Sequence, residues 1–219
     1  VGYTEALVSA NTNVAANTDK VGYTEAAVSA NTNVAANTAK VGYTEAAVSA
    51  NTNVAANTDK VGVTTHTIGE SYGGGIVFYV YDGGQHGLIA ATADQNTGTG
   101  IQWYNGTNTV TNAVRDGIGA GKINTEHIIA HQGSGTYAAQ ICANYQGGNY
   151  GDWYLPSKHE LNLLYLQKVA GTVDGFSNNY YWSSTEIFKY SAWRQGFNNG
   201  VQDYYYKDAP GSVRAVRAF

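Results

Sequence analysis

Apolar residues in the first 60 positions follow a fixed spacing. Valine recurs at intervals of seven, six and seven residues, and three residues after each valine stands a short polar residue, Thr or Asn. The twenty-residue block from Val1 to Lys20 returns at 21–40 and 41–60, with changes only at its seventh and nineteenth places. A period kept at this fidelity is typical of a fibrous array rather than of a globular core.

A coiled coil accommodates this spacing if valine takes every a position and the polar residue every d position. Asn, Thr and Val are mediocre helix formers and the apolar stripe is thin, so we expect such helices to be stable only in association. Around a threefold axis, three Asn amides can bond to one another or to a trapped ion or water, which fixes the register. The predicted polar layers of the stalk core are Asn11, Asn17, Asn31, Asn37, Asn51 and Asn57.

The repeated Val-x-x-Asn-Thr resembles the stalk motif of trimeric bacterial adhesins and fibre proteins. The resemblance implies a parallel homotrimer whose Asn layers can hold an anion. Twenty residues over six a/d turns give about 3.3 residues per turn, below the 3.5 of a heptad seam, so the six-residue step overwinds the helix. Similar steps in fibre proteins are relieved by short β-layers, and we expect one in each repeat. A flexible low-complexity linker and a β-solenoid or triple β-fibre are the alternatives.

The pattern changes near residue 66, which predicts a stalk over residues 1–66 and a head over residues 67–219. In the head, two strands are expected around the turn Asp82-Gly83-Gly84, then loops between 92 and 124 and a helix at 136–145. A second helix is expected after Ser157, which forms a capping box with Glu160. The segments NYYWSS, SAWRQGF, VQDYYYK and SVRAVRAF read as short strands. Strands, two helices and further strands indicate an α+β domain.

Four motifs in the head occur in a fixed order: DWYLPSKHELNLLY, YYWSSTE, AWRQGFNNGVQ and VRAVRAF. Together they are similar to a bacterial domain with a C-type-lectin-like fold, found at the tip of collagen-like adhesins and in some retroelement-diversified proteins. The resemblance implies that the first and last strands lie together and that the domain binds host glycans or proteins. It also implies framework residues, among which Trp182, Trp193 and Phe197 are assigned to the core.

Between these framework residues lies a set of aromatic and polar residues that we predict to contact a ligand. Tyr204, Tyr205 and Tyr206 are consecutive, so a strand must send at least one of them to solvent. Rigid tyrosines beside Arg and Asp supply contact area at low entropic cost. The alternative is that these tyrosines are ordinary sheet and trimer contacts. The predicted ligand-binding residues are Phe188, Tyr190, Arg194, Asp203, Tyr204, Tyr205, Tyr206 and Asp208.

Charge and motifs argue against several functions. The net charge is -4, shared equally by the repeats and the remainder, which gives no basic face for nucleic acid. No apolar run reaches membrane-spanning length, and the single cysteine, Cys142, is expected to be a small buried group. His127 and His131 stand four residues apart but lack a third ligand in view, so no metal is expected. We find no triad, phosphate loop or calcium loop, and therefore predict neither an enzyme nor a cofactor.

Two functions fit this sequence. In the first, the chain is an extracellular fibre on a cell surface or virion, and its tip binds a glycan or protein receptor. In the second, the head only caps, registers or laterally links a surface filament. The chain opens inside the repeat array and contains no Met, so we expect it to be a segment of a longer protein.

The valine and asparagine pattern predicts the oligomeric state. Sedimentation of residues 1–219 should give the mass of three chains, each of 23.2 kDa, because polar d positions are tolerable only where threefold neighbours meet them. At 1.5 Å per residue the stalk should be about 90 Å long, apart from changes at β-layers. A monomer at micromolar concentration would contradict the coiled-coil interpretation.

Overall fold

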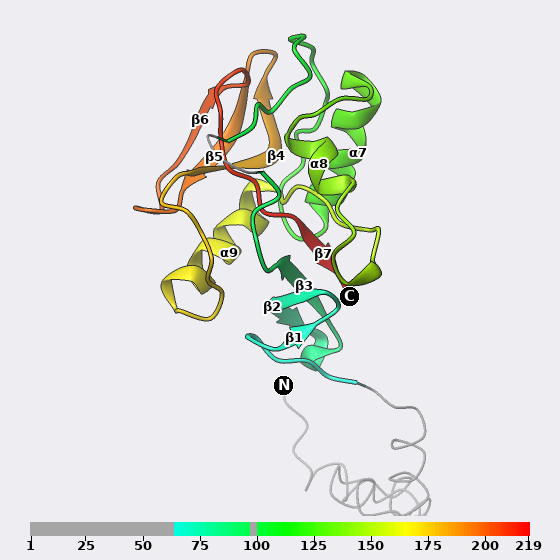
Figure 1. Ribbon diagram of the computed structural model, residues 1–219, viewed down its shortest axis with the longest axis vertical. Helices are drawn as coiled ribbons and strands as arrows, with labels where there is room; N and C mark the ends of the chain where they lie inside the picture. Colours follow the sequence, from blue (N-terminus) through cyan, green and yellow to red (C-terminus); the bar gives the residue numbers. More distant parts are fainter. Residues whose placement is uncertain (1–63, 97–99) are drawn as a thin grey trace, which may run out of the picture. The chain divides into compact units, whose positions relative to one another are not determined.

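Two antiparallel sheets form the framework of the domain (Figure 1). The computed structural model describes residues 64–96 and 100–219, and the predicted stalk up to residue 63 lies outside the described residues. The first sheet has the order β1-β2-β3-β7, with bounds Ser71–Tyr72, Gly75–Tyr81, His86–Ala91 and Val216–Ala218. The short 3-10 helix η1 (Asp82–Gly84) joins β2 to β3. The hairpin predicted at this turn is confirmed, and Gly83 supplies the left-handed backbone (φ +63°) that the turn requires.

The last strand joins the sheet built by the first three. Leu88 of β3 pairs with Ala218 of β7, and Ala90 pairs with Val216. Beyond the strand, the amide of Phe219 donates to the carbonyl of Gly87 at 3.1 Å. The C-terminal residues are therefore fixed to the hairpin that begins the domain.

The second sheet has the order β4-β5-β6 and carries most of the predicted site residues. Its strands span Tyr180–Phe188, Ser191–Gly196 and Gln202–Tyr206, where three of the predicted strands were expected. Both pairs are antiparallel, and the β4–β5 register shifts between Trp182 and Glu186. Among the described strands β6 pairs only with β5, so it forms an edge of this sheet.

Helix α9 (Lys158–Val169) begins at the predicted capping box. The Ser157 hydroxyl accepts from the Glu160 amide, while the Glu160 carboxylate accepts from the Ser157 amide at 2.8 Å. Burial raises the pKa of Glu160, although backbone amides donate to its carboxylate. Leu161 and Leu164 turn inward from this helix. Helix α8 (Ala138–Ala143) lies within the range predicted from the sequence, and the 3-10 turn η2 (Gly147–Asn149) follows it.

Helix α7 (Ala120–Gln132) corrects the prediction, because two helices were expected and the described residues contain three. Its first residues fall within the segment expected to be loops. The buried side of α7 carries Ala120, Gly121, Asn124, Thr125 and Ile128, so Ile128 is its single large apolar residue and no apolar stripe marks the helix in the sequence. Asn124 instead bonds to the backbone of Arg115, and the Thr125 hydroxyl accepts from the amide of Leu155. Hydrogen bonds at Asn124 and Thr125 thus supplement the apolar contact that Ile128 makes in the first cluster.

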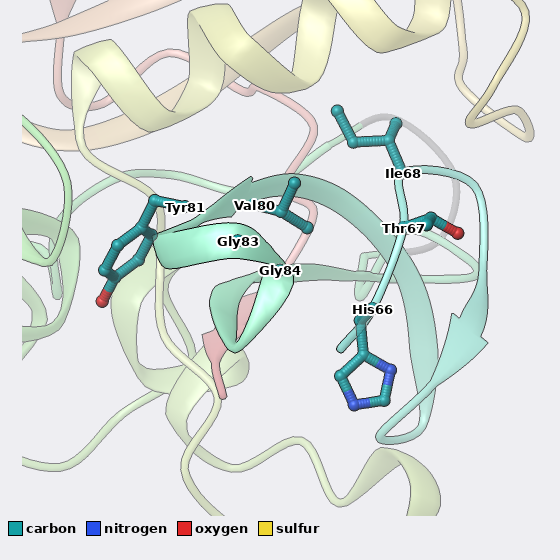
Figure 2. A pocket seen from close by; sticks show the side chains of 7 residues that line it. All are labelled: His66, Thr67, Ile68, Val80, Tyr81, Gly83 and Gly84. Atoms are coloured by element: carbon teal, nitrogen blue, oxygen red, sulfur yellow. The ribbon is translucent and has the colours of Figure 1, made fainter. Parts of the chain in front are cut away.

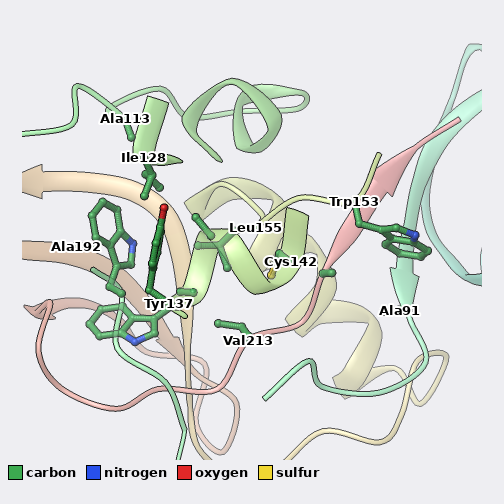
Figure 3. Close-up of a cluster of buried hydrophobic side chains, with 14 of the residues drawn as sticks. Ala91, Ala113, Ile128, Tyr137, Cys142, Trp153, Leu155, Ala192 and Val213 are labelled. Carbon is green, nitrogen blue, oxygen red and sulfur yellow. The ribbon is translucent and has the colours of Figure 1, made fainter. Parts of the chain in front are cut away.

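Two clusters of buried side chains connect the sheets. The first lies beside α7 and α8 and includes Trp103, Tyr137, Cys142 and Trp182 (Figure 3). The second lies against α9 and includes Phe78, Leu161, Tyr181 and Phe197. Burial of Trp182 and Phe197 agrees with their assignment to the core, and burial raises the pKa of the Cys142 thiol. Since strands and helices both contribute side chains to these clusters, the domain is of the mixed α+β class, as predicted.

An ion pair on β7 fixes the segment that precedes Trp153. The Arg217 guanidinium donates to both carboxylate oxygens of Asp152, at 2.7 and 3.0 Å, and lies 3.8 Å from the ring centre of Tyr150. The hydrogen bond from Arg217 holds the pKa of Asp152 below its ordinary value. This pair joins residues 150–152 to the last strand.

The lowered pKa of Asp152 makes part of the stability dependent on pH. A carboxylate with a depressed folded pKa stabilises the protein above its unfolded pKa, and that contribution is lost as pH falls through the folded value. Asp152→Asn should therefore lose less stability than the unsubstituted chain as pH falls below about 4. Thermal unfolding followed between about pH 3 and pH 7 measures the difference. Asp174→Asn, at an exposed aspartate, is the control, and equal profiles for both variants would contradict the assignment.

Candidate functional site

Five exposed aromatic side chains gather at one end of the second sheet. Phe188, Tyr190, Tyr204, Tyr205 and Tyr206 expose between 44% and 63% of their surface. Phe188 ends β4, Tyr190 lies in the turn before β5, and the three tyrosines end β6. We call this surface the aromatic edge. All three consecutive tyrosines are exposed, which exceeds the minimum of one that strand alternation requires.

The pairing of β5 with β6 divides the predicted site residues between two faces. Trp193 pairs with Tyr204, and Arg194 pairs with Asp203. Directly paired residues share a face and neighbouring residues alternate, so Tyr204 lies on one face and Asp203 on the other. The predicted ligand-binding residues therefore lie close together in the fold but are divided between the two faces of the sheet.

On the first face, the Tyr204 ring meets the rings of Phe188 and Trp193 edge to face. We call the surface formed by these three residues the Tyr204 face. The ring of Tyr204 lies 5.8 Å from that of Trp193 and 6.1 Å from that of Phe188, both nearly perpendicular. The Lys158 ammonium lies 4.4 Å from the Trp193 ring and 3.6 Å from the Asp116 carboxylate. Edge-to-face pairs of this kind are favourable beyond the area that they bury.

Trp193 corrects one assignment made from the sequence. It was expected in the core, but it is only half-buried and belongs to neither buried cluster. The reason is its direction: it points to the face where Lys158 and Tyr204 cover it, whereas the adjacent Ala192 points into the first cluster. Trp193 is thus the floor of the Tyr204 face.

On the opposite face, the Arg194 guanidinium lies between two tyrosine rings. It is 3.8 Å from the ring centre of Tyr180 and 3.9 Å from that of Tyr205. Its Nε and Nη2 donate to the two Asp203 oxygens at 2.9 and 3.3 Å. The Arg194 side chain is 14% exposed. Stacking and a bidentate ion pair together leave the guanidinium one orientation.

The remaining predicted residues lie at the margins of the aromatic edge. The Lys189 ammonium is 5.3 Å from the Tyr190 ring, and the Tyr206 ring meets Tyr205 at 5.7 Å. Asp208 is exposed in the turn after β6, where its backbone carbonyl accepts from the Gln102 amide at 2.9 Å. Tyr190, Tyr206 and Asp208 therefore extend the aromatic edge beyond the two faces.

A buried ion pair beneath the edge was not predicted from the sequence. The Lys207 ammonium donates to Glu186 at 2.5 Å and to the carbonyls of Thr109 and Lys189. The side chains of Lys207 and Glu186 are 0% and 2% exposed. Glu186 also accepts from the amides of Thr111 and Asn112. No local signal marks this pair, because a lysine beside a run of polar and aromatic residues reads as exposed.

Burial lowers the pKa of Lys207, while the hydrogen bond and charge of Glu186 act in the opposite direction. All three ammonium protons have an oxygen partner, so the desolvated charge is fully compensated. Lys207 follows Tyr206 directly and thereby fixes the end of β6 to β4 and to the 109–112 loop.

Other parts of the described chain offer little chemistry. The rings of His127 and His131 lie 6.4 Å apart, and among the described residues no three His, Cys, Asp or Glu side chains are placed to hold a metal. A cavity of about 470 Å³ lies beside the β2–η1 turn, lined by residues 66–68, Val80, Tyr81, Gly83 and Gly84 (Figure 2). No predicted site residue lines it. Within the described residues, no helix has the length and apolar character needed to cross a bilayer.

These features define a class of protein: a mixed α+β domain that presents an exposed aromatic edge on a fixed sheet. The chain belongs to the Lcl C-terminal domain family, whose profile matches residues 91–217. This domain is found in the Legionella collagen-like adhesin, and the family is not an enzyme family. The matched range includes every predicted ligand-binding residue. The resemblance to a domain of collagen-like adhesins is thereby confirmed for residues 91–217. No curated protein matches the sequence.

The buried pair predicts a large effect of substitution at Lys207. Lys207→Met leaves Glu186 buried without a counter-charge, which should lower the free energy of unfolding by about 3–5 kcal/mol. Adding Glu186→Gln should restore part of the loss, because the uncompensated charge is gone. Denaturant unfolding of both variants measures this. If Lys207→Met alone had the same free energy of unfolding as the unsubstituted chain, the role given to Lys207 would be contradicted.

Proposed function

We propose that the described domain is the receptor-binding tip of an extracellular fibre, and that the Tyr204 face makes the central contact with a glycan or protein receptor. The observation that carries the proposal is the exposure of five aromatic side chains at one end of one sheet. Grouped exposed apolar groups on a soluble domain mark interaction sites. Aromatic rings serve both receptor classes, since they stack on sugar faces and fill pockets in proteins.

The rigidity of the surroundings supports this role. Trp193 lies on the central strand β5, and Lys207 fixes the end of β6 through the buried Glu186. The Tyr204 ring already meets both Phe188 and Trp193, so few rotamers of Tyr204 remain to be lost on binding. A surface that is arranged before contact loses less conformational entropy when it binds.

The wider proposal includes the fold type and the assembly. A C-type-lectin-like fold is supported by the last strand, β7, lying in the same sheet as the first three. The membership of residues 91–217 in the Lcl C-terminal domain family supports a place on a surface adhesin. Residues 1–66 would then form the parallel homotrimeric stalk, with Asn layers and short β-layers, on a cell surface or virion.

A structural role is the second candidate, and one observation favours it. Val110, Val114 and Ile118, in the segment that precedes α7, expose 50%, 61% and 40% of their surface. Aliphatic side chains so exposed are suited to packing against a neighbouring head. In that case the domain links filaments laterally, and the aromatic edge has no receptor.

Substitution at Tyr204 separates the two functions. Tyr204→Ala removes the central ring of the Tyr204 face, and a central aromatic residue of an interface typically contributes about 1–3 kcal/mol to binding. Attachment of residues 1–219 to receptor-bearing cells or to a glycan array should therefore weaken about 5- to 150-fold. Calorimetric or surface-based titration against the receptor so found measures the change. Chelating agents should have no effect.

Tyr81→Ala is the matched control, because Tyr81 is a similarly exposed tyrosine on β2 of the other sheet. It should bind as the unsubstituted chain does, and both variants should keep the same unfolding temperature within a few degrees. Equal binding by the Tyr204 and Tyr81 variants would refute the assignment of the receptor contact to the Tyr204 face.

A further inference from the structure

A small pocket lies on the face of the second sheet that carries Arg194, opposite the Tyr204 face. Its volume is about 260 Å³, and its lining consists of Asn179, Tyr180, Arg194, Pro210, Gly211 and Ser212. One wall is the start of β4 and the middle of β5. The other is the Pro210–Ser212 segment, which runs beside β4 through the bridge between Tyr181 and Ser212. Neither the family match nor the proposed receptor contact accounts for this pocket.

The pocket offers both donors and acceptors. Arg194 uses Nε and Nη2 for Asp203, so among the described residues its Nη1 protons and one Nη2 proton have no acceptor. The Asn179 side-chain amide likewise has no partner among the described residues, although its backbone carbonyl accepts from Phe197. The Ser212 hydroxyl meets Ser177 at 3.1 Å. These groups can serve a ligand with several hydroxyls.

Charge limits the class of ligand. Arg194 is the only charged residue in the lining, and Asp203 already neutralises it through a bidentate ion pair. An anion would have to compete with Asp203 for a guanidinium that two tyrosine rings hold in place. An uncharged ligand uses the free N–H groups without disturbing that pair. Electrostatics therefore favours a neutral polar molecule.

Size limits it further. The volume lies just below the range of about 300–1,000 Å³ that drug-sized ligands occupy, so it suits a single ring. The free edge of a guanidinium presents parallel N–H groups, and a side-chain amide presents a donor beside an acceptor. Two adjacent hydroxyls on a saturated ring match both arrangements.

We propose that this pocket binds one uncharged pyranose ring of a neutral saccharide, through the free N–H groups of Arg194 and the amide of Asn179. The site is separate from the Tyr204 face and does not depend on the receptor proposed there. A chain that carries both sites would contact a sugar and a second surface from opposite sides of one sheet.

The test uses methyl glycosides of glucose, galactose, mannose and N-acetylglucosamine, with methyl glucuronide as the charged counterpart of the glucoside. Saturation-transfer NMR on residues 1–219 detects binding, and calorimetric titration gives affinity. At least one neutral glycoside should bind at millimolar concentration and more tightly than the glucuronide. Absence of binding by all four neutral glycosides, or preference for the glucuronide, overturns the proposal.

Asn179→Leu and Asn178→Leu locate the site. Leucine is close to asparagine in size but has no hydrogen-bonding groups, and both positions are exposed neighbours, of which only Asn179 lines the pocket. Asn179→Leu should weaken glycoside binding about tenfold or more, the effect of losing one well-made hydrogen bond to a ligand. Asn178→Leu should leave the affinity unchanged. Equal affinities of the two variants would place the sugar elsewhere and reject the pocket.

Discussion

The salt bridge between Lys207 and Glu186 is the interaction on which the exposed aromatic edge depends. Five aromatic side chains in water would favour collapse onto any nearby apolar surface unless β6, which carries three of them, were held in place. Lys207 holds it from below, because its ammonium reaches Glu186 of β4 and the carbonyls of Thr109 and Lys189 at once. A charge buried with all its protons bonded allows one arrangement and penalises others. The pair thus fixes position more than it adds stability.

Two further arginines act in the same way on the irregular parts of the chain. Arg214 is fully buried and donates to Asp94 and to the carbonyls of Ala91 and Gly175. Arg217 joins β7 to Asp152. Among the described residues, no helix or strand lies between α9 and β4, where Arg214 donates to the carbonyls of Asp174 and Gly175, and backbone groups in such a segment need side-chain partners. Long, multiply bonding cations on the C-terminal segment supply them, which explains why so many buried residues of this domain are charged.

Sequence reasoning succeeded where the signal was local. The capping box at Ser157 and Glu160 and the aromatic strands of the second sheet are readable from neighbouring residues, and the structure has them there. Helix α7 was missed because its buried face carries Asn124 and Thr125, which bond to distant backbone groups instead of forming an apolar stripe. The partner of Lys207 lies 21 residues away, and only the folded chain brings the two together.

The sequence located the candidate site, but it did not show that the site residues lie on two opposite faces of the sheet. Alternation along β6 separates Tyr204 from Tyr205, yet which of them shares a face with Arg194 depends on the β5–β6 register. That register follows from the Phe197–Val201 turn, where the Gly200 amide donates to the carbonyl of Gly196. One residue of slip would bring Tyr204 to the face of Arg194 and move Tyr205 and Asp203 to the other face. Register is therefore what makes two chemically different surfaces from one short sequence.

The edge position of β6 gives these surfaces a further property. Among the described strands, β6 pairs on one side only, so the outward halves of Tyr204, Tyr205 and Tyr206 meet no second strand. A side chain at such a position can change without disturbing a ladder beyond it, whereas Lys207, Trp182 and Phe197 are enclosed. Buried Lys207 thus follows the exposed Tyr204, Tyr205 and Tyr206 directly in the sequence. A fold arranged in this way keeps its core constant while its outermost strand is free to take different side chains for different surfaces, provided that the anchor after residue 206 is retained.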